Sequence, residues 1–187
     1  MGFFLVVIAA ACYGQAPTGG GAAAVPAGKG SGAGAQTPAV AHVKEQAAAM
    51  GHALIQGQYK TFAHYIYPAL VKMMGGEDKM ADQMGTIVGG MKQKGMVFLS
   101  VKFDEPSAIV HSGTELECTV AQHTEIKVPD GRAVATSTLI AISTDKGVHW
   151  SFVDTSNKDL ATIKQLLPEL SSAIVIPPPV APVHYNN

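Results

Sequence analysis

The spacing of hydrophobic residues in this 187-residue chain changes at Gly95. Before Gly95, apolar residues recur every three or four positions, which predicts helices. The segments with helical spacing are 43–56, 59–73 and 79–94. After Gly95, runs rich in Val, Ile, Thr and aromatic residues predict strands. The segments with strand character are 96–103, 108–111, 114–128, 132–143 and 148–153.

This order of elements predicts an α+β fold. We expect the N-terminal helices to pack on one face of a curved antiparallel sheet, followed by a short C-terminal helix over 158–170. Ser156 or Asn157 is the expected N-cap of that helix. Pro129-Asp130-Gly131 and Asp145-Lys146-Gly147 predict two hairpin turns.

Alternation within 114–128 predicts a sheet with one buried face and one solvent-facing face. Three apolar residues alternate there with three polar ones: Leu116, Cys118 and Val120 with Glu115, Glu117 and Thr119. We therefore expect Cys118 to be buried and chemically inert.

Composition excludes several classes of protein. Charged residues make up 14% of the chain, and the formal net charge is −1 at pH 7. Without clustered Lys and Arg, binding to nucleic acid by electrostatic attraction is excluded. Two cysteines exclude a disulfide scaffold and a Cys-based zinc site. The seven histidines show no short metal-ligand spacing, and no P-loop is present, so neither a metal nor a cofactor is predicted.

The N-terminal segment predicts export. Residues 3–11 (FFLVVIAAA) fit the hydrophobic region of a secretory signal and are too short to span a bilayer. The triplet Gly14-Gln15-Ala16 favours cleavage after a signal peptide of residues 1–16. Alternatively, residues 9–12 (AAAC) resemble a lipobox, in which Cys12 would be lipidated and anchor the chain. Both routes predict a periplasmic or secreted protein, and only the second attaches it to a membrane, through the lipid on Cys12.

Low-complexity segments define the expected domain boundaries. Residues 17–41 are rich in Gly, Ala and Pro and predict a disordered linker. Residues 177–187 contain Pro177, Pro178, Pro179 and Pro182, which predict an extended tail. One folded domain over 42–176 remains between them.

Several segments carry a resemblance to known proteins. They are YP at 67–68, MMGG at 73–76, KVPDGR at 127–132, STLIAISTD at 137–145, FVDTS at 152–156, LP at 167–168 and IVIP at 174–177. Over about residues 43–178 the chain resembles a family of uncharacterised exported proteins from the Bacteroidetes. The helices followed by long strands also resemble the NTF2-like (cystatin-like cone) superfamily. The resemblance implies a fold and a compartment but no reaction.

Cone-shaped domains of that class often hold an apolar pocket between the helices and the concave sheet, and some use an acid–base pair there. The candidate catalytic residues are His64, Tyr67 and Asp104. Tyr65 and Trp150 are the candidate ligand contacts. The structural alternative is that the tyrosines pack with their hydroxyls at the rim and that Asp104 belongs to a turn.

One further motif predicts structure only. Residues 143–150 (STDKGVHW) match the Asp-box pattern S-x-D-x-G-x-x-W of sialidase-type propellers. A propeller repeats its blade several times, whereas this chain contains one copy. The motif therefore predicts a local turn.

Three functions remain open from the sequence. The first is a binding module for a small apolar ligand or an envelope protein. The alternative is a small lyase, isomerase or hydrolase that uses the cone pocket. The third is an envelope module that forms a homodimer through the outer sheet face, although the charges of Glu117, His123 and Lys127 oppose that pairing.

Overall fold

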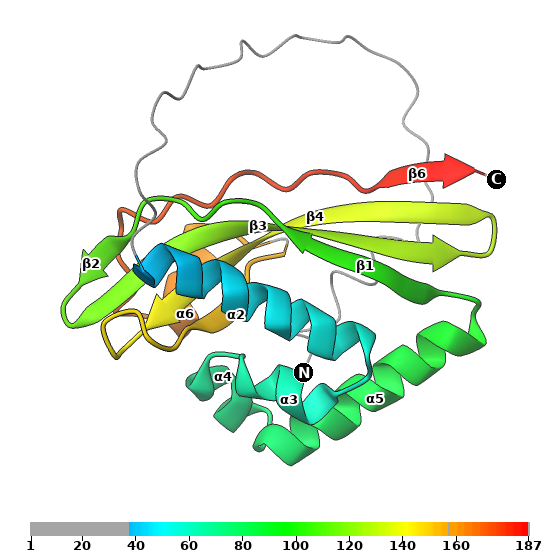
Figure 1. Cartoon of the computed structure of the whole chain (residues 1–187), viewed down its shortest axis with the longest axis horizontal. Coiled ribbons are helices and arrows are strands. Elements are labelled where there is room, and N and C mark those ends of the chain that lie inside the picture. The colour runs from blue at the N-terminus through cyan, green and yellow to red at the C-terminus, as the bar shows by residue number, and fades with distance from the viewer. Residues whose placement is uncertain (1–37, 157, 187) are drawn as a thin grey trace, which may run out of the picture.

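A computed structural model describes residues 38–156 and 158–186. Within them the chain forms an α+β fold, as predicted, with a curved, open, antiparallel sheet of six strands and several helices (Figure 1). The predicted signal peptide, Cys12 and residues 17–37 of the predicted linker lie outside the described residues. None of the helices within the described ranges is long and apolar enough to cross a membrane.

In the described part of the chain, four helices precede the sheet and lie along one of its faces (Figure 1). They are α2 (Pro38–Ile55), α3 (Tyr59–His64), α4 (Pro68–Met73) and α5 (Glu77–Gln93). Helix α2 begins before the expected position 43 because Pro38 occupies its first turn, where a missing N–H leaves no helical bond unmade. The helix expected over 59–73 is divided into α3 and α4, because Pro68 cannot continue a helix and instead begins α4.

The strands follow in a meander. They are β1 (Val97–Phe103), β2 (Val110–Ser112), β3 (Glu115–Val128), β4 (Gly131–Ser143), β5 (Ser151–Asp154) and β6 (Val183–Asn186). The order across the sheet is β1-β3-β4-β5, with β2 paired to β3 and β6 paired to β4. The predicted turn at Pro129-Asp130 closes the long β3–β4 hairpin, in which Val128 is opposite Gly131.

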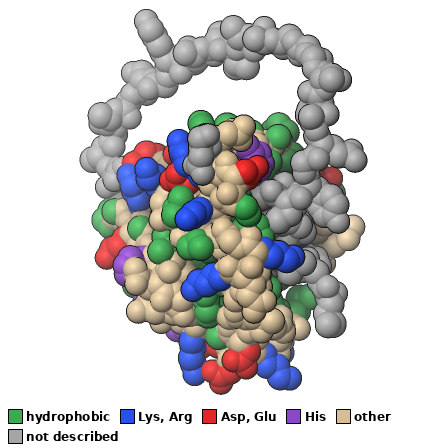
Figure 2. All heavy atoms as spheres, turned by 90° about the vertical axis from the view of Figure 1, so that its right-hand side faces the viewer, with side chains coloured by type: hydrophobic (Ala, Val, Ile, Leu, Met, Phe, Trp, Pro, Cys, Tyr) green, Lys and Arg blue, Asp and Glu red, His purple; other side chains and the backbone are tan. Residues whose placement is uncertain are grey.

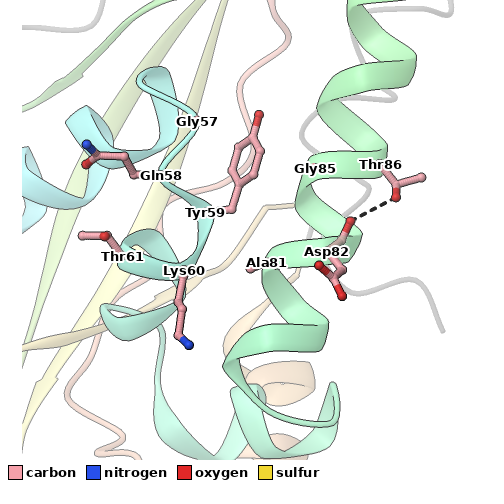
Figure 3. A pocket seen from close by; sticks show the side chains of 9 residues that line it. All are labelled: Gly57, Gln58, Tyr59, Lys60, Thr61, Ala81, Asp82, Gly85 and Thr86. Carbon is pink, nitrogen blue, oxygen red and sulfur yellow. Dashed lines mark hydrogen bonds between the residues drawn. The ribbon is translucent and has the colours of Figure 1, made fainter.

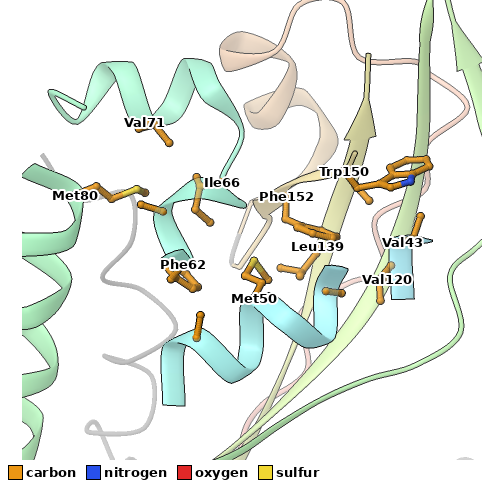
Figure 4. Packing of buried hydrophobic residues seen from close by; sticks show 14 of the residues in the cluster. Val43, Met50, Phe62, Ile66, Val71, Met80, Val120, Leu139, Trp150 and Phe152 are labelled. Atoms are coloured by element: carbon orange, nitrogen blue, oxygen red, sulfur yellow. The ribbon is translucent and has the colours of Figure 1, made fainter. Parts of the chain in front are cut away.

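The main core lies between the helices and the sheet face that they cover (Figure 4). Met50, Phe62, Met80 and Phe152 fill its centre, and each is at most 5% exposed. Cys118 is fully buried in the same cluster, as predicted. The methionines adapt well to the irregular gaps between three helices and a curved sheet.

The opposite sheet face is also partly covered, contrary to the expectation of one solvent-facing side. Helix α6 (Leu160–Leu166) and the chain after it pack there in what we call the second cluster. Its buried members are Ile140, Ile142, Val153, Ile163, Leu167, Leu170 and Ile174. The expectation that Glu117 faces solvent is therefore wrong, because this residue is fully buried beside the second cluster's strands.

The two ends of α6 also differ from the expected bounds. The N-cap is Asp159, whose carboxylate accepts the Thr162 N–H at 2.8 Å, and not Ser156 or Asn157. The helix ends at Leu166 because Pro168 cannot continue it and restricts the residue before it. In the predicted tail, residues 183–186 form β6 and are not a free end.

Candidate functional site

Three of the sequence candidates, His64, Tyr65 and Tyr67, lie where α3 meets α4. This junction is anchored to β5, because the Phe152 N–H donates to the Tyr65 carbonyl at 2.8 Å and the Tyr67 N–H donates to the Phe152 carbonyl at 3.1 Å. The His64 side chain is 78% exposed, with Nδ1 3.4 Å from Oε1 of Glu77. Tyr65 packs against the main core, whereas Tyr67 packs against the second cluster. The rings of His64 and Tyr65 lie edge to face with their centroids 6.3 Å apart, but Tyr67 packs on the side of the second cluster, so the three side chains do not converge.

Tyr67 lies near a buried carboxylate, that of Glu117. Oε2 of Glu117 accepts the Ser171 N–H at 3.0 Å, while Oε1 is buried without a hydrogen-bond partner. Burial raises the pKa of Glu117, and the charge of Glu115 adds to this effect. Burial together with the charges of Glu115 and Glu117 raises the pKa of Tyr67. This arrangement lies on the α6 side of the sheet, away from the expected pocket.

Trp150 closes the Asp-box turn. Its indole N–H donates to the Gly147 carbonyl at 3.1 Å, and the residue is 3% exposed. The Gly147 N–H donates to Oγ of Ser143 at 2.9 Å, and the His149 N–H donates to Oδ1 of Asp145 at 2.9 Å. The bonds from His149 hold the pKa of Asp145 well below its usual range. Trp150 is thus engaged by the turn and the main core.

Asp104 belongs to a group of three side chains that we call the relay. Its Oδ2 lies 3.0 Å from Nε2 of His123, and Nδ1 of His123 lies 3.1 Å from Oγ1 of Thr136. Strand register produces this grouping. His123 pairs with Lys102 of β1 and with Thr136 of β4, and Asp104 directly follows β1. The relay lies on the sheet face opposite the four N-terminal helices.

The relay has the order of groups that can activate a hydroxyl. When Asp104 accepts from Nε2–H, the neutral imidazole of His123 keeps Nδ1 free to accept the Thr136 hydroxyl. The Asp104 side chain is 61% exposed, so water weakens its influence on the ring. His123 and Thr136 were not among the candidate site residues from the sequence, although the hairpin turn places them opposite each other.

A second polar group lies beside the relay on the same face. Nη1 of Arg132 donates to Oε1 of Glu125 at 2.7 Å, and Oγ of Ser100 donates to Oε2 at 3.2 Å. The bond from Arg132 lowers the pKa of Glu125. The Arg132 guanidinium also lies 4.1 Å from the centroid of the Tyr185 ring. Figure 2 views this end of the molecule, where Lys and Arg side chains lie among hydrophobic ones.

A hollow of about 790 Å³ lies elsewhere, between α3 and α5 (Figure 3). It is lined by Gly57, Gln58, Tyr59, Lys60, Thr61, Ala81, Asp82, Gly85 and Thr86. None of the candidate residues from the sequence lines it. In the part of the chain that the structure describes, no group of three or more His, Cys, Asp or Glu side chains is placed to hold a metal ion.

Comparison with known proteins adds no relative: no family model and no curated protein matches the chain. The assignment of a function therefore rests on the side chains described above.

Proposed function

We propose that the chain is a binding module that recognises a protein partner through the part of the outer sheet face that α6 leaves uncovered. We call this part the open face; it is formed by β1, β3, β4 and β6. The observation that carries the proposal is the set of exposed hydrophobic residues at its two margins. Val97 and Leu99 lie on β1 and are 38% and 47% exposed; Val183 and Tyr185 lie on β6 and are 49% and 45% exposed.

The middle of the open face is polar. The relay and the Glu125–Arg132 pair lie between the two margins. Apolar side chains beside hydrogen-bonding ones are typical of surfaces that bind other proteins reversibly. Asp104 is paired with His123, and Glu125 with Arg132, so a partner can cover these four groups at a lower desolvation cost than isolated charges. Lys102 and Lys127 also lie on this face, outside these two pairs.

The packing of the main core favours a surface site over an interior pocket for an apolar ligand. Met50, Phe62 and Met80, which lie between the helices and the sheet, belong to one buried cluster. A ligand between the helices and the sheet would have to displace them, at the cost of core contacts.

We also propose export and an NTF2-like architecture for this module. The apolar segment 3–11 supports export to the periplasm or the exterior, with Cys12 as the alternative point of lipid attachment. The helices that cover one face of a curved sheet support the architecture. The intact mass of the mature protein tests export: a new N-terminus after Ala16 or a lipidated Cys12 is expected, and an unprocessed Met1 would contradict it.

Site-specific photocrosslinking in the cells that naturally make the protein tests the partner proposal. A photoreactive residue at Leu99 should give one discrete protein adduct, whereas the same residue at the exposed Gln83 of α5 should give none. Equal labelling from both positions, or none from Leu99 and Val183, would contradict the proposal. Native mass spectrometry of the purified protein provides the other arm, since a retained apolar molecule would indicate ligand binding instead.

A small hydrolase is the second candidate function, and the relay is the observation that favours it. If Thr136 is a nucleophile, hydrolysis of an activated ester should fall at least tenfold in both Thr136→Val and Asp104→Asn. For a binding module, both variants should retain the weak rate of the wild type. Equal rates in all three proteins would exclude this candidate.

A further inference from the structure

Two strands share one edge of β4. Strand β5 pairs with residues 139–142, and β6 pairs with residues 131–134 near the hairpin turn. Figure 1 shows β6 as the outermost strand, reached through a long extended segment of the chain. Every residue of β6 is exposed, and the segment before it contains Pro177, Pro178, Pro179 and Pro182. Strand β6 therefore pairs with the sheet edge and contributes no residue to the main core or to the second cluster.

The edge of β4 is shaped for close approach of a strand. A Cβ on Gly131 would lie 2.0 Å from the carbonyl oxygen of Tyr185, so a side chain at this position is incompatible with the paired strand. At the next position the Arg132 guanidinium stacks over the Tyr185 ring. Because Glu125 already neutralises Arg132, an aromatic ring suits this position better than a second carboxylate.

We propose that residues 131–134 of β4 form an acceptor site for an extended strand of a partner protein, and that β6 is the chain's own occupant of this site. The partner strand runs antiparallel to β4 and places an aromatic side chain over Arg132. Backbone hydrogen bonds supply its affinity and the ring supplies its selectivity, as in other cases of strand addition. This inference rests on the proposed function, because the site forms one margin of the open face.

The contacts of β6 make displacement physically reasonable. Four exposed residues bury little apolar area, so local opening of β6 costs far less than unfolding of the sheet. A partner strand must still compete with a tethered tail, whose effective concentration is on the order of millimolar. The tail thus raises the affinity that a partner needs and excludes weak strands.

A peptide titration with the full-length chain tests the site. The double variant His184→Pro and Tyr185→Pro removes two consecutive β6 N–H groups and should vacate the edge. A fluorescent peptide with the sequence of residues 178–187 (PPVAPVHYNN) should bind this variant at least tenfold more tightly than the wild type. The same peptide carrying Tyr185→Ala should bind several-fold more weakly, because the ring over Arg132 is lost.

Three results would overturn the inference. The first is no peptide binding to the double variant when its circular dichroism and melting curve match those of the wild type. The second comes from hydrogen exchange of the unmodified chain: β6 amides should exchange much faster than β3 and β4 amides, and equal protection would show that the tail does not open locally. The third is a wild-type dimer whose two copies exchange β6, because the site would then accept a second copy of this chain and not a partner protein.

This experiment and the crosslinking experiment can fail independently. The crosslinker at Leu99 reports the β1 margin, whereas the peptide reports the β6 margin. An adduct from Leu99 without peptide binding would leave the proposed function intact and remove only the acceptor site.

Discussion

Glu117 carries a carboxylate under the second cluster, where one of its two oxygens has no hydrogen-bond donor. An ionised carboxylate in such surroundings loses much of its hydration and recovers only part of that loss from the single Ser171 N–H. The charge of Lys164 partly offsets the loss, while that of Glu115 opposes it. Folding therefore raises the pKa of Glu117.

The raised pKa of Glu117 predicts how stability changes with pH. Because the folded state keeps this proton to a higher pH than the unfolded state, the stabilising contribution is complete below the ordinary value of 4.5 and is lost as the pH rises through the raised native value. Glu117→Gln keeps an acceptor for Ser171 and cannot ionise. The Tm of Glu117→Gln minus the Tm of the wild type should therefore be about 2–4 °C larger at pH 8 than at pH 4.

The control for this titration is Glu45→Gln, which changes an exposed carboxylate on α2. Its Tm should follow that of the wild type across the same range of pH. A constant difference between Glu117→Gln and the wild type at all pH values would show that folding does not raise the pKa of Glu117.

The relay shows which residue contacts can be predicted from the sequence. Once the turn places Val128 opposite Gly131, counting back along both strands places Thr136 opposite His123. The contact with Asp104 cannot be counted in this way, because the β1–β3 register shifts between Phe98 and Ser100. A bulge adds one unpaired residue to the strand, and no residue in this segment marks its position in the sequence.

At the scale of elements, Gly51 sets the distance between α2 and β1. A Cβ at this position would lie 2.9 Å from Cε2 of Phe103 and 3.2 Å from the Val101 side chain. The glycine weakens the helix by itself but lets α2 approach the strand closely. Helix periodicity alone does not reveal this role.

Gly51→Ala should destabilise the protein by about 1–3 kcal/mol, because overpacking against Phe103 and Val101 exceeds the gain in helix propensity. Gly90→Ala in α5 is the matched control, since a Cβ there meets no atom within 4 Å. That control should stabilise the protein by about 0.5–1 kcal/mol. Urea unfolding measures both values, and equal effects would show that α2 can move away from the sheet without cost.

Element boundaries were predictable where a single residue decides them, as Pro68 does between α3 and α4. Pro168 decides the end of α6 in the same way. The helix ends at Leu166, four residues before the end of the expected range 158–170. The strand expected over 148–153 begins only at Ser151, because Val148 and His149 belong to the Asp-box turn. The pairing of β6 could not be predicted, because its backbone contacts leave no hydrophobic pattern.

At the scale of the whole molecule, both sheet faces are covered at the β5 end, while only one is covered at the hairpin end. The alternation along β3 correctly indicated the face that packs against α2–α5. It could not indicate that the opposite face is also covered, because α6 packs there from a distant part of the chain. Cys118 of β3 lies in the main core, where burial raises the pKa of its thiol to about 12.

Cys118 should therefore report global unfolding. In a Cys12→Ser variant of the full chain, the remaining thiol should react with an aromatic disulfide reagent at least 1,000-fold more slowly than a free thiol, because reaction requires opening of the main core. The labelling rate should rise with urea in parallel with unfolding. Rapid labelling of the native protein would contradict the strand register.

The attachment of β6 also determines how the molecule responds to a pulling force. Asn186 pairs with Gly131 at the turn end of β4, so a force that pulls the C-terminus sideways, away from β4, acts on that outermost pair first. The remaining pairs then open one after another, each under the full force, whereas a strand pulled along its own axis resists with all of its bonds at once. A protein whose C-terminus is pulled in that direction would thus release the four residues of β6 and the proline segment before the main core or the second cluster is strained.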